Sequence, residues 1–182
     1  IPMPPIALGK GPVAIFPPHK RVKSFFDKIG DVIEIKSEKL SQNFWATSGT
    51  MASFYEMLKI LSEWLVKKGL TRLQAQKYIT SLYSALAQLA AVNSRKDLKY
   101  FVAESQTPGG LNWQGVNELR KAGYYKSLEK SINNILKRLK SGEAKIINKK
   151  NHFFSRIHVE DIANILCNSL NLFKKKEIYN IS

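Results

Sequence analysis

The chain has 182 residues, of which 44% are hydrophobic and 10% aromatic, enough to bury one sizeable core, or one core plus a small appendage. No run of about 18 apolar residues is present, and the first residues have neither the charged nor the apolar region of a signal peptide. These features exclude a membrane span. With a single cysteine, Cys167, an internal disulfide is also excluded, so we expect a cytosolic protein.

The formal net charge of +15 raises nucleic acid as a partner, because clustered Lys and Arg displace counterions from phosphates. The basic residues are instead spread along the chain, and the longest run is Lys174 to Lys176. A general bias toward Lys, Ile and Asn accounts for this distribution. We therefore do not expect a specific nucleic-acid site.

The first forty residues predict the end of an open α/β sheet. The apolar run Gly11 to Phe16 predicts a strand, and apolar residues at helical spacing from Val22 to Ile29 predict a helix that ends before Gly30. The run Val32 to Ile35 predicts a second strand. Such a strand-helix-strand unit completes a sheet of this kind but is too short to form one.

From about residue 41 the pattern changes to amphipathic helices. Phe54, Leu58, Leu61 and Leu65 recur at i, i+4, i+7 and i+11, which predicts one apolar helix face, and Gly69 predicts the helix end.

A second helix is predicted after Thr71, because Gln74 follows at the spacing of a capping box. Further helices are expected after Asp97 and up to the Pro108-Gly109-Gly110 break, over Trp113 to Ala122, and over Ser127 to Lys140.

After Gly142 the pattern returns to mixed α/β, with a helix from about Glu160 to Leu172 and a last strand over Ile178 to Ile181. The fold class expected is therefore mainly α. A helical domain of about five helices is preceded by the β-α-β unit and followed by a small α/β tail. The predicted domain boundaries are 1–40, 41–139 and 140–182.

Two stretches of the helical region carry a family resemblance. Residues 46–55 (ATSGTMASFY) place the pair Ser48-Gly49 before a long helix, and Thr107-Pro108-Gly109-Gly110 precedes a short helix, a glycine and a final helix. In order and spacing, residues 6–139 resemble pyrroline-5-carboxylate reductases. The resemblance implies a homodimerisation domain, with the first forty residues in the place of the last strands of a Rossmann-type cofactor domain.

The Pro-Gly-Gly turn also favours an anion site on physical grounds, apart from the family resemblance. A helix that follows it exposes backbone N–H groups at the positive end of its dipole, and glycine lets a small carboxylate approach the main chain. In the resembled family this loop holds the carboxylate of an amino-acid-like substrate. The resemblance thus implies a substrate site at Ser48, Gly49, Thr107, Pro108, Gly109, Gly110 and Leu111. The alternative is an ordinary interhelical turn.

The chain departs from the family at two places. Residues 48–53 read SGTMAS, without the second glycine and the proline of the family's SGSGPA. Asn112 stands where the family has a threonine close to the reacting imine nitrogen, so Asn112 is the candidate catalytic residue by position. An amide can donate and accept a hydrogen bond, but its reach differs from that of a hydroxyl. The substrate therefore need not be pyrroline-5-carboxylate itself.

Hydride transfer needs a nicotinamide cofactor, whose pyrophosphate binds a glycine-rich turn between a strand and a helix. Gly9-Lys10-Gly11 lacks the third glycine and precedes a strand, so it does not predict this turn. We expect NADP or NAD to bind a cofactor domain in a longer form of the protein or in a partner. This chain, as a fragment or fusion, is expected neither to bind the cofactor tightly nor to be active alone.

The end of the chain resembles a second family. Residues 154–163 (FSRIHVEDIA) and 178–182 (IYNIS) are similar to the C-terminal segment of extended short-chain dehydrogenases and NAD-dependent epimerases. That segment helps to form the substrate side of the site in those enzymes. The resemblance therefore implies substrate-binding roles for Arg156 and His158.

Two functions follow as hypotheses. The first is the substrate-binding and dimerisation part of an NAD(P)H-dependent oxidoreductase that reduces an imine in proline-type metabolism. The alternative is a non-catalytic homodimerisation module, suggested by large apolar helix faces. No metal site is predicted, because His152, His158 and Asp161 lack a second ligand pair.

Overall fold

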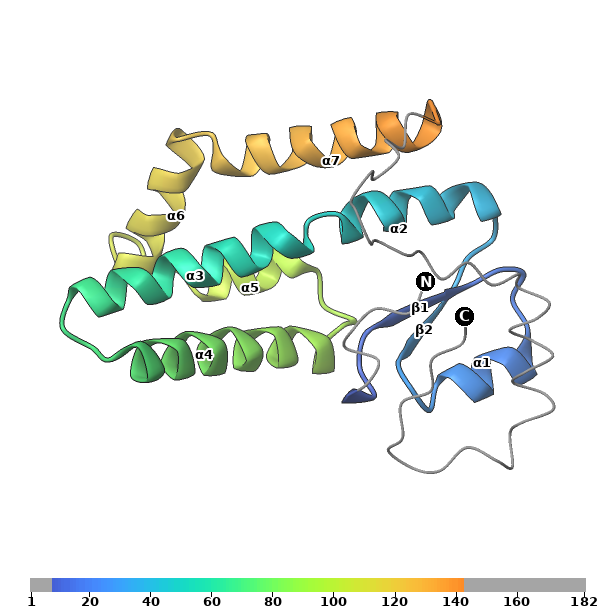
Figure 1. Ribbon diagram of the computed structural model, residues 1–182, viewed down its shortest axis with the longest axis horizontal. Coiled ribbons are helices and arrows are strands. Elements are labelled where there is room, and N and C mark those ends of the chain that lie inside the picture. The colour runs from blue at the N-terminus through green and yellow to red at the C-terminus, as the bar shows by residue number, and fades with distance from the viewer. Residues whose placement is uncertain (1–7, 143–182) are drawn as a thin grey trace, which may run out of the picture. The chain divides into compact units, whose positions relative to one another are not determined.

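The computed structural model describes residues 8–142 (Figure 1). The predicted α/β tail lies outside these residues, together with its epimerase-like segment. Within the described range the chain is mainly helical, with a small parallel sheet near its start, as the sequence predicts.

The strand-helix-strand unit is confirmed. Strand β1 (Pro12–Ile15) lies parallel to β2 (Asp31–Glu34), and helix α1 (Lys20–Phe26) connects them. The helix ends earlier than expected, and the chain continues in turns, because the Lys28 and Ile29 N–H groups donate to the carbonyls three residues back, at 3.3 Å and 3.0 Å. A Cβ at Gly30 would lie 2.5 Å from the Gly11 carbonyl oxygen, so this close approach at the start of the sheet requires glycine.

The helical region begins with a 3-10 turn, η2 (Glu38–Leu40), and continues as α2 (Ser41–Ser48), α3 (Met51–Lys67), α4 (Arg72–Val92), α5 (Leu98–Glu104), α6 (Leu111–Lys121) and α7 (Tyr124–Lys140). The sequence predicts about five of these helices and misses α2 as a separate element. Helix α7 begins before the expected Ser127, directly after Gly123, which adopts the left-handed conformation with φ of 76°.

Several helix starts follow from local chemistry. In the capping box of α4, the Thr71 hydroxyl accepts from the Gln74 N–H at 3.3 Å, and Gln74 Oε1 accepts from the Thr71 N–H at 3.0 Å. At the start of α5, Asp97 Oδ1 accepts from the Lys99 N–H at 2.9 Å. Both caps agree with the sequence prediction.

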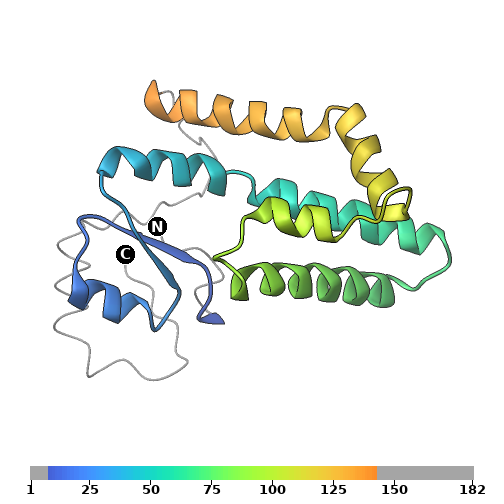
Figure 2. The same cartoon turned by 180° about the vertical axis from the view of Figure 1, so that it is seen from behind.

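The helices pack in pairs. Helix α3 packs against α4, and α7 packs against both α2 and α6 (Figures 1 and 2). Figure 2 shows the same pairs from behind. The buried hydrophobic residues of the described chain are few: Ile15, Ile35, Ala46, Ala75 and Ile79. These pairs therefore leave most large apolar side chains partly exposed. Among residues 8–142, no helix combines the length and hydropathy needed to cross a membrane.

Candidate functional site

The loop between α5 and α6 is a tight turn built on its two glycines. The Gly110 N–H donates to the Thr107 carbonyl at 2.8 Å, and Gly109 has a left-handed φ of 74°. A Cβ at Gly110 would lie 3.0 Å from the Thr107 carbonyl oxygen. Both positions therefore favour glycine, one for its conformation and the other for space.

Two side-chain amides reach from the first turns of α6 back to this loop. The Nδ2 of Asn112 donates to the Ser105 carbonyl at 3.0 Å, and the Nε2 of Gln114 donates to the Gly109 carbonyl at 2.8 Å. The Gln114 N–H also donates to the Gly110 carbonyl at 3.0 Å, as the first regular bond of the helix. The loop is thus tied to α6 near its beginning and near its end.

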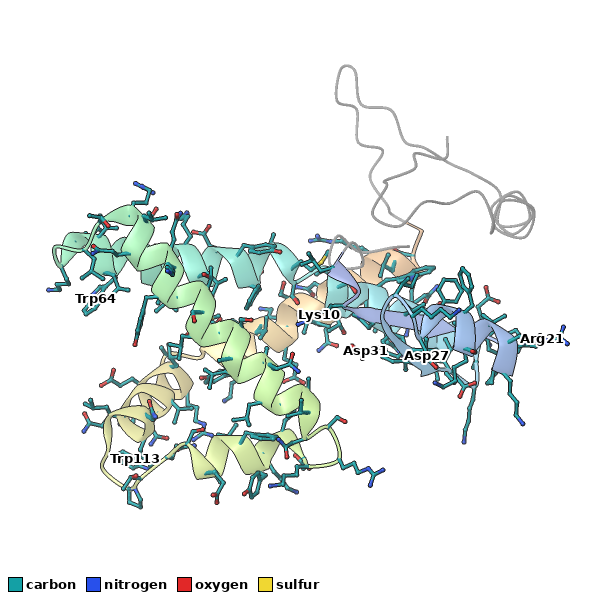
Figure 3. The ribbon with its side chains drawn as sticks, turned by 90° about the horizontal axis from the view of Figure 1, so that it is seen from below. Lys10, Arg21, Asp27, Asp31, Trp64 and Trp113 are labelled. Atoms are coloured by element: carbon teal, nitrogen blue, oxygen red, sulfur yellow. The ribbon has the colours of Figure 1, made fainter. Side chains whose placement is uncertain are left out.

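The start of α6 presents backbone donors. Gly110 is the N-cap and has no side chain to accept from the first-turn N–H groups, and this first turn contains no acidic residue. Leu111 is 86% exposed, and Trp113 is 43% exposed near the same end of the helix (Figure 3). The positive dipole end therefore has the chemistry for a small anion such as a carboxylate.

The Ser-Gly segment lies elsewhere, at the junction of α2 and α3. Ser48 ends α2 and Gly49 is its C-cap, after which α3 begins at Met51. A Cβ at Gly49 would lie 3.1 Å from Cδ1 of Ile135 in α7. The small residue therefore lets α2 approach α7 closely. Figure 1 shows this junction apart from the α5–α6 loop, so the described chain does not bring the two signatures together.

The other candidates fall into two groups. Thr107, Pro108, Gly109, Gly110, Leu111 and Asn112 are brought together in one loop and helix start. Arg156 and His158 lie outside the described residues, as do the three residues weighed as a metal cluster. Within residues 8–142, no group of three His, Cys, Asp or Glu side chains could hold a metal ion.

The β-α-β unit has no glycine-rich turn between its first strand and its helix, where the pyrophosphate of a nicotinamide cofactor usually binds. Gly9 and Gly11 have positive φ values but precede β1. The turn from β1 into α1 runs through Phe16, Pro17, Pro18 and His19, and contains no glycine to let a pyrophosphate approach the backbone.

The sequence does not predict a cluster of three tyrosines from α4 and α7. The rings of Tyr124 and Tyr125 meet edge to face with centroids 5.2 Å apart. Burial raises the pKa of Tyr83 above its ordinary value of 10.0, and the phenols of Tyr124 and Tyr125 raise the pKa further. The sequence also does not predict the hydrogen bonds that Ser105 and Gln114 make at the α5–α6 loop. Hydrogen bonds between side chains and loop carbonyls depend on the backbone path of the turn, which the sequence pattern does not give.

The helical region of the chain matches a known protein family. A family model described as pyrroline-5-carboxylate reductase dimerisation matches residues 38–141, more than half of the chain. No curated protein matches the chain.

Three solved structures that share this fold are pyrroline-5-carboxylate reductases by their descriptions. A Plasmodium falciparum pyrroline carboxylate reductase with NADP bound is 19% identical with a TM-score of 0.61, and the match covers 75% of this chain and 58% of that chain. A Coxiella burnetii pyrroline-5-carboxylate reductase is 20% identical with a TM-score of 0.63, and the match covers 74% of this chain and 52% of that chain. A 1-pyrroline-5-carboxylate reductase from Streptococcus pyogenes is 23% identical with a TM-score of 0.62, and the match covers 75% of this chain and 55% of that chain. The chain thus spans little more than half the length of these proteins.

Proposed function

The chain belongs to the pyrroline-5-carboxylate reductase dimerisation family, and on that premise we propose that it is the substrate-binding and dimerisation part of an NAD(P)H-dependent oxidoreductase that reduces an imine. The observation that carries the proposal is the match over residues 38–141, which includes η2 and α2 to α7. Since the turn of the β-α-β unit has no glycine to let a pyrophosphate approach the backbone, we propose that NADP or NAD binds to a separate cofactor domain.

We propose a second copy of this chain as the partner of the exposed helix faces. The end of α4, residues 84–92 (SALAQLAAV), is apolar on nearly all sides. Yet Leu86, Leu89 and Val92 are 50%, 52% and 68% exposed. A helix that is hydrophobic all round is stable in water when another surface covers it. A second copy supplies matching apolar surface through two-fold symmetry.

The proposed substrate is a small carboxylate, such as a cyclic imino acid, at the start of α6. The first-turn N–H groups, the positive dipole end and the absence of acidic residues in this turn support a site for an anion there. Asn112 stands at the family's threonine position, next to these donors. We infer that the loop Thr107 to Leu111 holds the carboxylate.

Two measurements on the purified chain test the proposal together. Sedimentation equilibrium at micromolar concentration is expected to give twice the chain mass of 20.7 kDa, and titration with NADPH is expected to give no tight binding. A monomeric mass would refute the dimerisation part. Micromolar NADPH affinity would refute only the placement of the cofactor site and leave the dimer standing.

A non-catalytic dimerisation module remains the second candidate, and one contact favours it. The amide of Asn112 is engaged with the Ser105 carbonyl, whereas imine reduction in the resembled family places a hydroxyl near the reacting nitrogen. Titration with L-proline, followed through the backbone amide NMR signals of Gly109 to Leu111, separates the two functions. Saturable shifts support the reductase part, and unchanged signals up to high millimolar L-proline support the module.

A further inference from the structure

The side chains of α6 use their amides in the opposite sense from those of α4. In α4, the Gln74 side chain accepts a hydrogen bond through Oε1 and so satisfies the Thr71 N–H at the helix start. In α6, Asn112 and Gln114 donate through their NH₂ groups to loop carbonyls. Donation to carbonyls leaves the N–H groups of the first turn of α6 uncapped by these contacts.

The two donors also act on different parts of the loop. Asn112 reaches back to Ser105, directly after α5, and Gln114 reaches Gly109, which carries the positive φ. Without such contacts, a loop with two adjacent glycines samples many backbone conformations. The hydrogen bonds from Asn112 and Gln114 thus hold one loop conformation, in which the Gly110 N–H donates to the Thr107 carbonyl.

We propose that Asn112 and Gln114 are positioning residues that brace the α5–α6 loop, and that Asn112 acts on a bound carboxylate through the loop rather than by touching the ligand. The claim about a bound carboxylate rests on the proposed substrate site, whereas the claim that the loop is braced does not. The brace by Asn112 would distinguish this chain from family members that have a threonine at this position. A threonine side chain is shorter than that of asparagine, so its hydroxyl cannot reach the Ser105 carbonyl in the same way.

The first experiment measures amide hydrogen exchange by NMR and needs no ligand. Replacing Asn112 by alanine is expected to speed exchange of the Gly110 N–H about three- to tenfold, the effect of losing one net hydrogen bond. Asn112→Thr and Gln114→Ala are expected to do the same. The matched control is Asn117→Ala, whose Oδ1 accepts only from Arg120 within α6 at 3.3 Å, and should leave the rate unchanged. Since Asn112 and Gln114 are exposed, these variants keep the core intact.

The second experiment titrates L-proline as the probe and follows the Leu111 amide signal. If the residues are braces, Asn112→Ala, Asn112→Thr and Gln114→Ala should each weaken binding by a similar factor of about three to ten. A direct contact from Asn112 would instead make Asn112→Ala weak while Gln114→Ala binds normally, and this result would overturn the second half.

The two experiments test separate claims, and each claim can be refuted without the other. If the wild-type chain does not bind L-proline, the proposed substrate site is wrong, while the exchange rates still decide whether the braces exist. If exchange of the Gly110 N–H in Asn112→Ala equals that of the wild-type chain, the brace is refuted whatever the chain binds.

Discussion

At the scale of single residues, the space around a glycine determines whether a larger side chain can replace it. Gly49 and Gly115 are both glycines of the helical region, but a Cβ at Gly49 would press on Ile135, whereas a Cβ at Gly115 would meet no atom within 4 Å. The sequence identifies Gly49 as part of a signature and gives no reason to place it against α7. That reason is the packing of two helices far apart in the chain.

We therefore expect valine to have opposite effects at the two glycines. Gly49→Val should lower the free energy of unfolding by about 1–3 kcal/mol, because overpacking forces α2 and α7 apart. Gly115→Val should be neutral or raise it by a few tenths of a kcal/mol, since valine has a better helix propensity than glycine. Urea unfolding followed by circular dichroism measures both. Equal destabilisation by the two variants would contradict the role of Gly49.

Tyr83 gives a prediction on pH. Because burial raises its pKa in the folded state, the folded chain keeps this proton to higher pH than the unfolded chain does. The contribution of Tyr83 to stability is then complete below about pH 10 and declines as the pH rises above it. Tyr83→Phe should flatten the fall in thermal stability above pH 10 relative to the wild-type chain. Tyr78→Phe on the same helix is the control, and an identical flattening there would refute the assignment.

At the scale of elements, the sequence predicts what local chemistry determines. The capping box at Thr71, the Asp97 cap and the stop at Gly69 all appear where the spacing places them. The sequence does not separate α2 from α3, because the break at Gly49 and Thr50 has ordinary negative φ values and no proline. The hydrogen bonds of Asn112 and Gln114 are also not predicted from the sequence. The sequence predicts where the α5–α6 turn lies but not its backbone conformation, on which these hydrogen bonds depend.

The capping box should be measurable in isolation. Thr71→Ala removes the acceptor for the Gln74 N–H and is expected to cost about 1 kcal/mol of stability. Thr80→Ala is the matched control in the middle of α4, where the Thr80 hydroxyl donates to the Gln76 carbonyl at 2.8 Å. There alanine should be neutral or slightly stabilising, because it is the better helix former. A larger loss from Thr80→Ala than from Thr71→Ala would contradict the cap.

At the scale of the whole molecule, apolar surface exceeds what the helix pairs cover. Trp64 is 57% exposed at the end of α3 (Figure 3), and the apolar stretch of α4 is exposed along its length. The amphipathic spacing predicts apolar faces but cannot say whether a second helix of the same chain or of another copy covers them. The family match favours another copy.

A charge on that stretch should separate the copies. Leu86→Glu is expected to shift the chain toward monomer, with the dissociation constant raised by at least about tenfold, because a carboxylate is costly to bury unpaired. Gln76→Glu introduces the same group at an exposed polar position of α4 and should leave the mass unchanged. Sedimentation velocity distinguishes them. A Leu86→Glu protein that stays dimeric at low micromolar concentration would place the interface elsewhere.

The uncovered end of α4 also has a consequence for how the protein unfolds. If its leucines are buried only between two chains, folding and association form one equilibrium, governed by mass action. The melting temperature would then rise with protein concentration, whereas a self-sufficient monomer melts at one temperature at every dilution. A newly synthesised chain would also expose the apolar end of α4 until it formed a dimer, so its abundance in a cell would depend on how often two copies encounter each other.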